Sequence, residues 1–148
     1  MIVVDASLAT KWMLWERDTP FALRFLSRHR DALCGPDLLF VEVAHAIVRY
    51  TNMLRHAEDD TLEALRKWTI AWGQHAVRPY RTTQRRLYAS ARLAITLRHP
   101  LPDCIYLALA MEHSCKLATC DAKFHNKAIG VYPEVKLLGE FELTGDKR

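Results

Sequence analysis

Short apolar segments of strand character alternate along this chain with longer segments of helical pattern. The first is the β-branched run at 2–4, which ends at Asp5. Further short strands are predicted at 32–34, 75–78, 116–120 and 131–137. Strands that are separated by helices pair in parallel and are covered on both faces. The order of segments therefore predicts an α/β fold, a three-layer α/β/α sandwich around a parallel sheet.

The segments between these strands predict the helices that cover the sheet. Their expected ranges are about 7–15, 20–30, 38–50, 58–72, 83–97, 103–113 and 123–128. Ser7 is expected to cap the first of them, since serine is a favoured N-cap residue. The helix at 38–48 is so apolar that we expect it to be buried nearly all round.

Length and composition narrow the class of protein. The chain has 148 residues, so we expect a single domain over 1–148 with a flexible tail at about 144–148. Half of the residues are hydrophobic, which excludes a disordered protein. Neither a signal peptide nor an apolar run near the ~20 residues of a membrane span is recognisable. The four cysteines form no CxxC pair and fit no common zinc spacing, so we expect free thiols and a cytoplasmic protein.

Four acidic residues stand in unusually apolar surroundings. Asp5 and Asp121 each follow a predicted strand directly. Glu42 and Asp103 are the only charges in two strongly apolar helical segments. Burying an unpaired carboxylate costs several kcal/mol, so each of these groups needs a polar partner.

Each acid taken singly has a structural explanation, such as an N-cap for Asp103, a turn for Asp5 or Asp121, or an ion pair with an arginine for Glu42. Taken together they suggest a site, because ligands of parallel sheets bind beyond the carboxyl ends of the strands. Carboxylates that converge there repel one another unless a cation neutralises them. Oxygen ligands suit Mg²⁺ or Mn²⁺, which can bind a phosphodiester and activate a water. The residues thus predict metal-assisted phosphodiester hydrolysis.

The segments that carry these acids resemble a known family, the PIN domains, and within it the VapC-type toxins of bacterial toxin–antitoxin pairs. The matching pieces are VVDAS at 3–7, the Glu42 helix after Pro36, LPDCIYLALA at 101–110 and TCDAKF at 119–124. Their order and spacing run across nearly the whole chain, and the combination of the last two is the most specific part.

The resemblance implies a Rossmann-like PIN domain with a parallel sheet of about five strands. It implies a Mg²⁺- or Mn²⁺-dependent endoribonuclease that acts on RNA, forms a homodimer and is blocked by a small VapB-like antitoxin. The alternative is a catalytically weak or inactive PIN-like module that binds nucleic acid or protein. The residues that the resemblance assigns to the site are the metal-binding and catalytic acids Asp5, Glu42, Asp103 and Asp121, supported by Ser7 and Thr119.

Basic residues offer further contacts to RNA. Lys11 either reaches a scissile phosphate or balances the acids. Arg81 and Arg85, with Arg92, lie on or near one helical stripe and form either a phosphate-contacting patch or a solvated face. The net charge is +4, but without the four site acids it is +8, which suits an RNA partner.

Other polar and aromatic residues near the acids have simpler expected places. His45 is expected in the core and His99 in a loop. Tyr106 is expected to pack in its helix, and Phe124 to pin the loop that follows Asp121.

Overall fold

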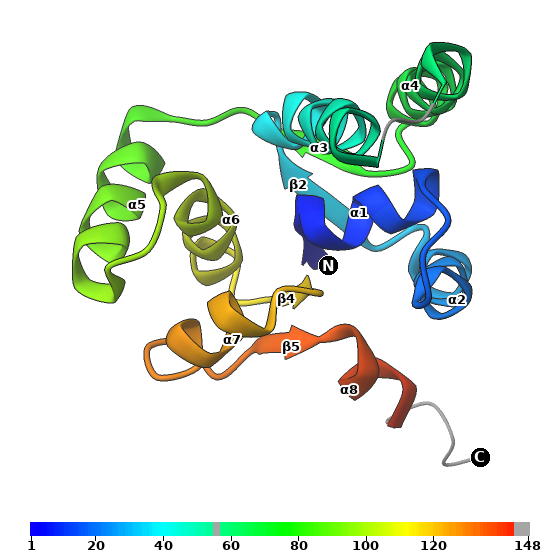
Figure 1. Cartoon of the computed structure of the whole chain (residues 1–148). Coiled ribbons are helices and arrows are strands. Elements are labelled where there is room, and N and C mark those ends of the chain that lie inside the picture. The colour runs from blue at the N-terminus through cyan, green and yellow to red at the C-terminus, as the bar shows by residue number, and fades with distance from the viewer. Residues whose placement is uncertain (55–56, 144–148) are drawn as a thin grey trace.

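Five parallel strands form a single sheet in the middle of the molecule (Figure 1). The structure is a computed structural model that describes residues 1–54 and 57–143, so the expected tail at 144–148 lies outside the described residues. The strand order is β3-β2-β1-β4-β5, and every neighbouring pair is parallel. The strands are β1 (Ile2–Val4), β2 (Leu33–Pro36), β3 (Arg78–Tyr80), β4 (Lys116–Thr119) and β5 (Val135–Leu137).

Helices cover both faces of this sheet. Helices α1 to α4 lie on one side and α5 to α7 on the other, while α8 packs beside β5 and α2 (Figure 1). The predicted α/β fold with a five-stranded parallel sheet is confirmed. None of the helices in the described part of the chain is long and apolar enough to cross a membrane. The helices are α1 (Ala6–Met13), α2 (Thr19–His29), α3 (Leu38–Leu54), α4 (Glu58–Gly73), α5 (Gln84–Leu97), α6 (Leu101–Glu112), α7 (Ala122–Ala128) and α8 (Leu138–Leu143).

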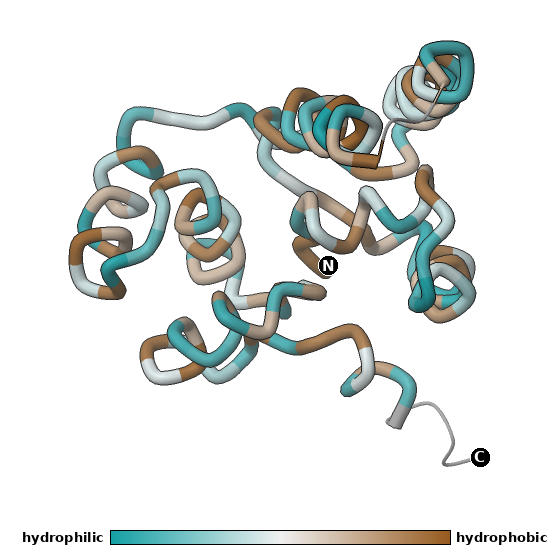
Figure 2. Tube along the Cα trace, in the orientation of Figure 1, coloured by the Kyte–Doolittle hydropathy of each residue, from teal (hydrophilic) through white to brown (hydrophobic). Residues whose placement is uncertain are grey.

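The core lies between the central strands and the helices packed on them. The side chains of Val3 and Val4 in β1 are fully buried, as a strand covered on both faces requires. Helix α6 packs against β1, β2 and β4 and is covered on its other side by α5, so residues 104–110 are all buried. Hydrophilic residues gather instead at the outer end of α4 (Figure 2).

The prediction that the helix at 38–48 is buried nearly all round is wrong. Helix α3 buries one stripe, formed by Leu39, Val43 and Ile47, against β2, α1 and α4. Val41 and Val48 point away from this stripe and are 62% and 42% exposed. Hydrophobicity alone does not separate a buried helix face from an apolar face that is open to solvent.

Three segments also differ from the predicted element boundaries, and one of them is the strand expected at 131–137, which is confined to Val135–Leu137. The strand expected at 75–78 is displaced to Arg78–Tyr80, because His75 adopts a left-handed backbone (φ 56°) in the turn that follows α4. Helix α8 was not predicted.

The topology places one crevice at the carboxyl end of the sheet. From β1 the chain crosses to β2 on one side, whereas β4 pairs with β1 on its other side. Connections therefore diverge between β1 and β4, and open α/β sheets bind ligands at such a switch point. Asp5 and Asp121 immediately follow these two strands.

Candidate active site

Asp5 and Asp121 make the same kind of strand-to-helix turn. Asp5 is the N-cap of α1, and its Oδ1 accepts a hydrogen bond from the backbone N–H of Leu8 at 3.1 Å. Asp121 is the N-cap of α7, and its Oδ1 accepts from the N–H of Phe124 at 3.0 Å. The prediction that Ser7 caps the first helix is wrong, because the cap falls two residues earlier. Both turns hold a carboxylate at the switch point.

Two hydroxyl groups join these turns. Ser7 Oγ donates to Asp5 Oδ1 at 2.6 Å and accepts from the N–H of Cys120 at 2.9 Å. It also lies 3.2 Å from Thr119 Oγ1, which accepts from the N–H of Asp121 at 3.0 Å. These are the contacts that a supporting role of Ser7 and Thr119 requires.

Helices α3 and α6 contribute the other two acids. The hydroxyl of Tyr106, one turn beyond Asp103, donates to Glu42 Oε2 at 2.5 Å. His99 Nε2 lies 2.6 Å from Asp103 Oδ2. The N-cap of α6 is Pro100, so Asp103 lies within the first turn and is not the cap. Tyr106 and His99, expected in packing and in a loop, thus both contact site acids.

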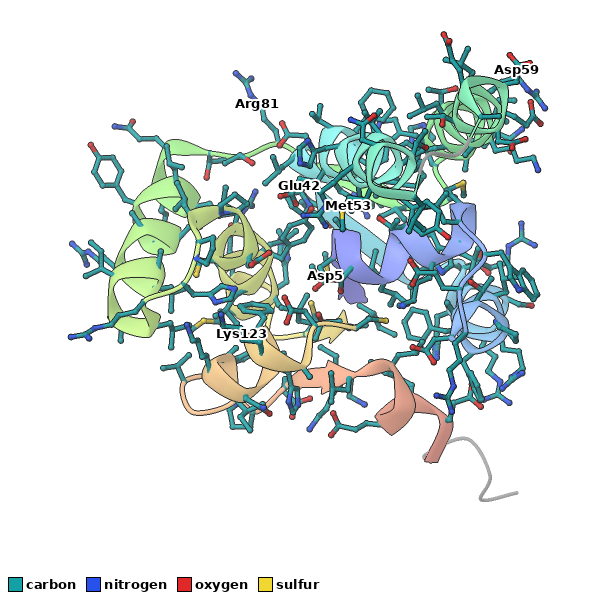
Figure 3. All side chains as sticks on the ribbon, in the orientation of Figure 1. Asp5, Glu42, Met53, Asp59, Arg81 and Lys123 are labelled. Carbon is teal, nitrogen blue, oxygen red and sulfur yellow. The ribbon has the colours of Figure 1, made fainter. Side chains whose placement is uncertain are left out.

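One open cleft of about 390 Å³ brings these groups together. Figure 3 shows Asp5 and Glu42 in the middle of the molecule, between α1, α3 and α6. Asp5 is only 4% exposed and lies beneath Ser7, while the other three predicted acids line the cleft. Ligand atoms of His99, Asp103 and Asp121 lie within 4.8 Å of one another. The polar residues that line the cleft are Ser7, Thr10, Glu16, Glu42, His45, Arg49, Asp103 and Asp121.

Burial disfavours the charged form of three of the four acids, Asp5, Glu42 and Asp103. Burial, with a smaller effect of the charge of Asp103, raises the pKa of Asp5 to about 6, against the hydrogen bonds of Ser7, Thr119 and Leu8. Burial also raises the pKa values of Glu42 and Asp103, and in each case a neighbouring acid adds to the rise.

No lysine or arginine among the described residues forms an ion pair with any of the four acids. Among the described residues, the basic side chain that does contact one of these acids is that of His99, at Asp103. A set of carboxylate oxygens is the donor set that Mg²⁺ or Mn²⁺ prefers, so the residues present fit such an ion.

The basic residues predicted to contact RNA do not line the cleft, although Lys11 pairs with Glu16, which does. Lys11 Nζ pairs with Glu16 at 2.6 Å and lies 3.7 Å from Asp18. Burial alone would lower the pKa of Lys11, but the contact with Glu16 raises it above its ordinary value. Arg81 lies in the loop after β3 and points away from the molecule (Figure 3), and Arg85 lines a separate groove between α5 and α6.

Four polar residues that line the cleft were not assigned to the site from the sequence, namely Thr10, Glu16, His45 and Arg49. His45 and Arg49 follow Glu42 on α3 at three and seven residues, and all three line the cleft. The expectation that His45 belongs to the core is wrong, since its side chain is exposed. The helical spacing from Glu42 was the signal that could have located His45 and Arg49.

Comparison with known proteins places this chain in a family. The family model of the PIN domain matches residues 2–130, and the chain belongs to the PIN domain family. Among curated proteins, none matches the chain with significant sequence similarity.

Solved structures share the fold at low sequence identity. PAE2754 from Pyrobaculum aerophilum superposes with a TM-score of 0.71 at 16% identity, over 97% of this chain and 87% of that one. A toxin–antitoxin complex from Klebsiella pneumoniae gives 0.68 at 17% identity, over 93% and 98%. VapC20 of Mycobacterium tuberculosis, described as a sarcin–ricin loop cleaving toxin, gives 0.69 at 14% identity, over 92% and 99%.

Proposed function

We propose that this PIN domain is a Mg²⁺- or Mn²⁺-dependent endoribonuclease that hydrolyses RNA phosphodiester bonds. The observation that carries the proposal is a group of four acids at the switch point, three lining one cleft and Asp5 coupled to Asp103, none of which pairs with a described lysine or arginine. A divalent cation supplies that partner, and RNA supplies the phosphate that such a site polarises.

The residues of the cleft have distinct roles in this proposal. The acids that would hold the cation are Asp5, Glu42, Asp103 and Asp121. A bound ion would neutralise phosphate charge and lower the pKa of a water that it binds. Ser7 fixes the carboxylate of Asp5, and Tyr106 fixes that of Glu42. Arg49 stands at the cleft with an exposed side chain and is placed to contact a substrate phosphate.

We further propose that the chain is the toxin of a toxin–antitoxin pair, acts in the cytoplasm and forms a homodimer. The support is the likeness in fold to VapC20 and to the toxin–antitoxin complex from Klebsiella pneumoniae. We propose as its partner a small antitoxin protein that covers the cleft, as the resemblance to VapC-type toxins implies.

The alternative of an inactive binding module predicts a different electrostatic arrangement. A site that has lost turnover no longer needs uncompensated carboxylates, and one of them could pair with an arginine. Among the described residues no such pair exists, so we propose the nuclease.

The test is the mapping of cut sites on total cellular RNA treated with the purified protein. We expect cleavage with Mg²⁺ or Mn²⁺, and its loss when the metal is chelated or when Asp103→Asn removes one acid. Asp59→Asn, which changes an exposed acid of α4, is the matched control and should cut like the wild type. Undiminished cleavage by the Asp103→Asn protein would refute the assigned site.

A further inference from the structure

His99 occupies a rigid position beside the cleft. It follows the left-handed residue Arg98 (φ 48°) that ends α5, and its backbone N–H bonds to the carbonyl of Ala94 at 3.1 Å. The next residue is Pro100, which restricts the backbone of the residue before it to extended conformations. The place of the imidazole is thus set by the connection between α5 and α6.

The imidazole is also held from the side of α7. Its ring stacks on that of Phe124, with centroids 5.0 Å apart and an interplanar angle of 28°. Phe124 is itself fixed, since its side chain is 1% exposed and its backbone N–H bonds to Asp121. The side chain of His99 is only 5% exposed as a result.

The two ring nitrogens of His99 have different surroundings. Nε2 lies 2.6 Å from a carboxylate oxygen of Asp103, which accepts, so Nε2 carries the hydrogen. Nδ1 is buried and has no hydrogen-bond partner within the described part of the chain. This arrangement suits a neutral ring with its hydrogen on Nε2, because Nδ1 then carries no hydrogen that would need an acceptor.

We propose that His99 is a positioning residue of the cleft, whose Nε2–H holds the carboxylate of Asp103 in the orientation that receives a divalent cation. The inference rests on the proposed function only in treating the four acids as a cation site. The other oxygen of Asp103, Oδ1, has no hydrogen bond to the described residues and stays available to the cation. Donors that orient a metal-binding carboxylate in this way strengthen metal affinity.

Direct coordination by His99 is the competing role, and the structure argues against it. For Nε2 to bind a cation, its hydrogen would have to move to Nδ1. That would leave a buried N–H without an acceptor among the described residues, which is costly. The geometry therefore favours a donor to Asp103 over a nitrogen ligand.

The test measures Mn²⁺ and Mg²⁺ affinity in the absence of RNA, using Mn²⁺ paramagnetic resonance and Mg²⁺ competition. His99→Phe keeps a ring to stack on Phe124 but removes the donor, and we expect both affinities to fall about 10- to 100-fold. His99→Gln, which places an amide N–H near the position of Nε2, should restore most of the loss. His113→Gln changes an exposed histidine at the end of α6 and is the matched control.

Unchanged affinities in His99→Phe would overturn the inference. A loss for Mn²⁺ at least tenfold larger than for Mg²⁺, without rescue by glutamine, would also overturn it, because that pattern marks a lost nitrogen ligand. Asp103→Asn separates this failure from that of the proposed function. If the Asp103→Asn protein binds the ions like the wild type, the assignment of the cation site is wrong. If the Asp103→Asn protein loses affinity but the His99→Phe protein binds like the wild type, only the positioning role of His99 is wrong.

Nitrogen-15 NMR of the wild-type protein gives a readout that does not depend on any variant folding. We expect the His99 signals to report hydrogen on Nε2 both before and after addition of Mg²⁺. Hydrogen on Nδ1 in the Mg²⁺-bound protein would contradict the positioning role.

Discussion

Two regions of this molecule bury charge in opposite ways. On α5 the side chain of Arg86 is 4% exposed, and its Nε donates to Glu112 Oε2 at 2.9 Å. Its Nη1 also donates to the backbone carbonyl of Arg81 at 2.6 Å. In the cleft, Asp5 is equally buried, but its neighbours are hydroxyls, an amide and another acid.

The difference indicates that the buried charge of Arg86 stabilises the fold, whereas the buried acids around Asp5 are suited to bind a ligand. Arg86 is neutralised by Glu112, and this ion pair joins α5 to α6. The charge of Arg86 is therefore balanced within the fold. Burial raises the pKa values of Asp5, Glu42 and Asp103, and no lysine or arginine of the described residues forms an ion pair with them. We therefore expect a counter-charge from outside the chain.

The largest expected effect is on activity. Asp5→Asn should reduce RNA cleavage by about 10²- to 10³-fold, which is the size of loss seen when one group that stabilises a transition state is removed. Glu112→Gln removes an acid of the Arg86 pair and should leave cleavage within about twofold of wild type. The measurement is the initial rate on a labelled RNA at saturating Mg²⁺. Equal losses in the two variants would remove the distinction between the regions.

Stability of the metal-free protein should respond with opposite signs. The raised pKa of Asp5 corresponds to a cost of up to about 3 kcal/mol at pH 7, so Asp5→Asn should stabilise the fold by up to that amount. Arg86→Met should destabilise it by about 1–3 kcal/mol, since the pair and the bond to Arg81 are lost. Urea unfolding in the presence of a chelator measures both. Destabilisation by Asp5→Asn would show that its charge is already balanced.

The pH dependence of stability follows from the same shift. The pKa of Asp5 is about 6 in the folded chain against 3.8 as its ordinary value, so the folded state binds more protons between these values. The free energy of unfolding of the metal-free protein should therefore fall as pH rises from about 4 to above 6. The raised pKa values of Glu42 and Asp103 act in the same direction. Unfolding curves of Asp5→Asn should show a smaller fall, and an equal fall would assign the effect to other groups.

The smallest expected effect concerns the donor to Glu42. Tyr106→Phe keeps the buried ring and removes one hydrogen bond, which is worth about 1 kcal/mol. We expect Mg²⁺ affinity to fall about fivefold, as measured by calorimetry, because Glu42 loses its orientation. Tyr88→Phe, at an exposed tyrosine of α5, is the control and should bind Mg²⁺ like the wild type.

The sequence predicted the parts of the candidate site that depend on topology. Asp5 and Asp121 could be located because parallel strands bring their carboxyl ends to one edge. Glu42 and Asp103 could be located because a lone charge in an apolar helix needs a polar neighbour. That Glu42, Asp103 and Asp121 line one cleft, with Asp5 buried next to it, follows from the strand order, which the alternation of elements only suggested.

The sequence did not predict the parts that depend on side-chain geometry. The role of His99 requires the position of Phe124, on a different helix, to be known. Lys11 looked free to reach a phosphate because its partner, Glu16, lies in a loop whose path has no sequence signature. The exposed apolar face of α3 was missed because hydropathy does not tell which neighbour covers a residue.

Calorimetric titration of Mg²⁺ or Mn²⁺ into the metal-free protein at pH 6 tests the central claim, that the cleft acids await an external cation, most directly. Repeating the titration in buffers of different ionisation enthalpy counts the protons released. Because the pKa of Asp5 is about 6, we expect binding to release about half a proton or more, and Asp5→Asn to lose much of that release. Absence of binding at millimolar metal, or binding without proton release, would contradict the account.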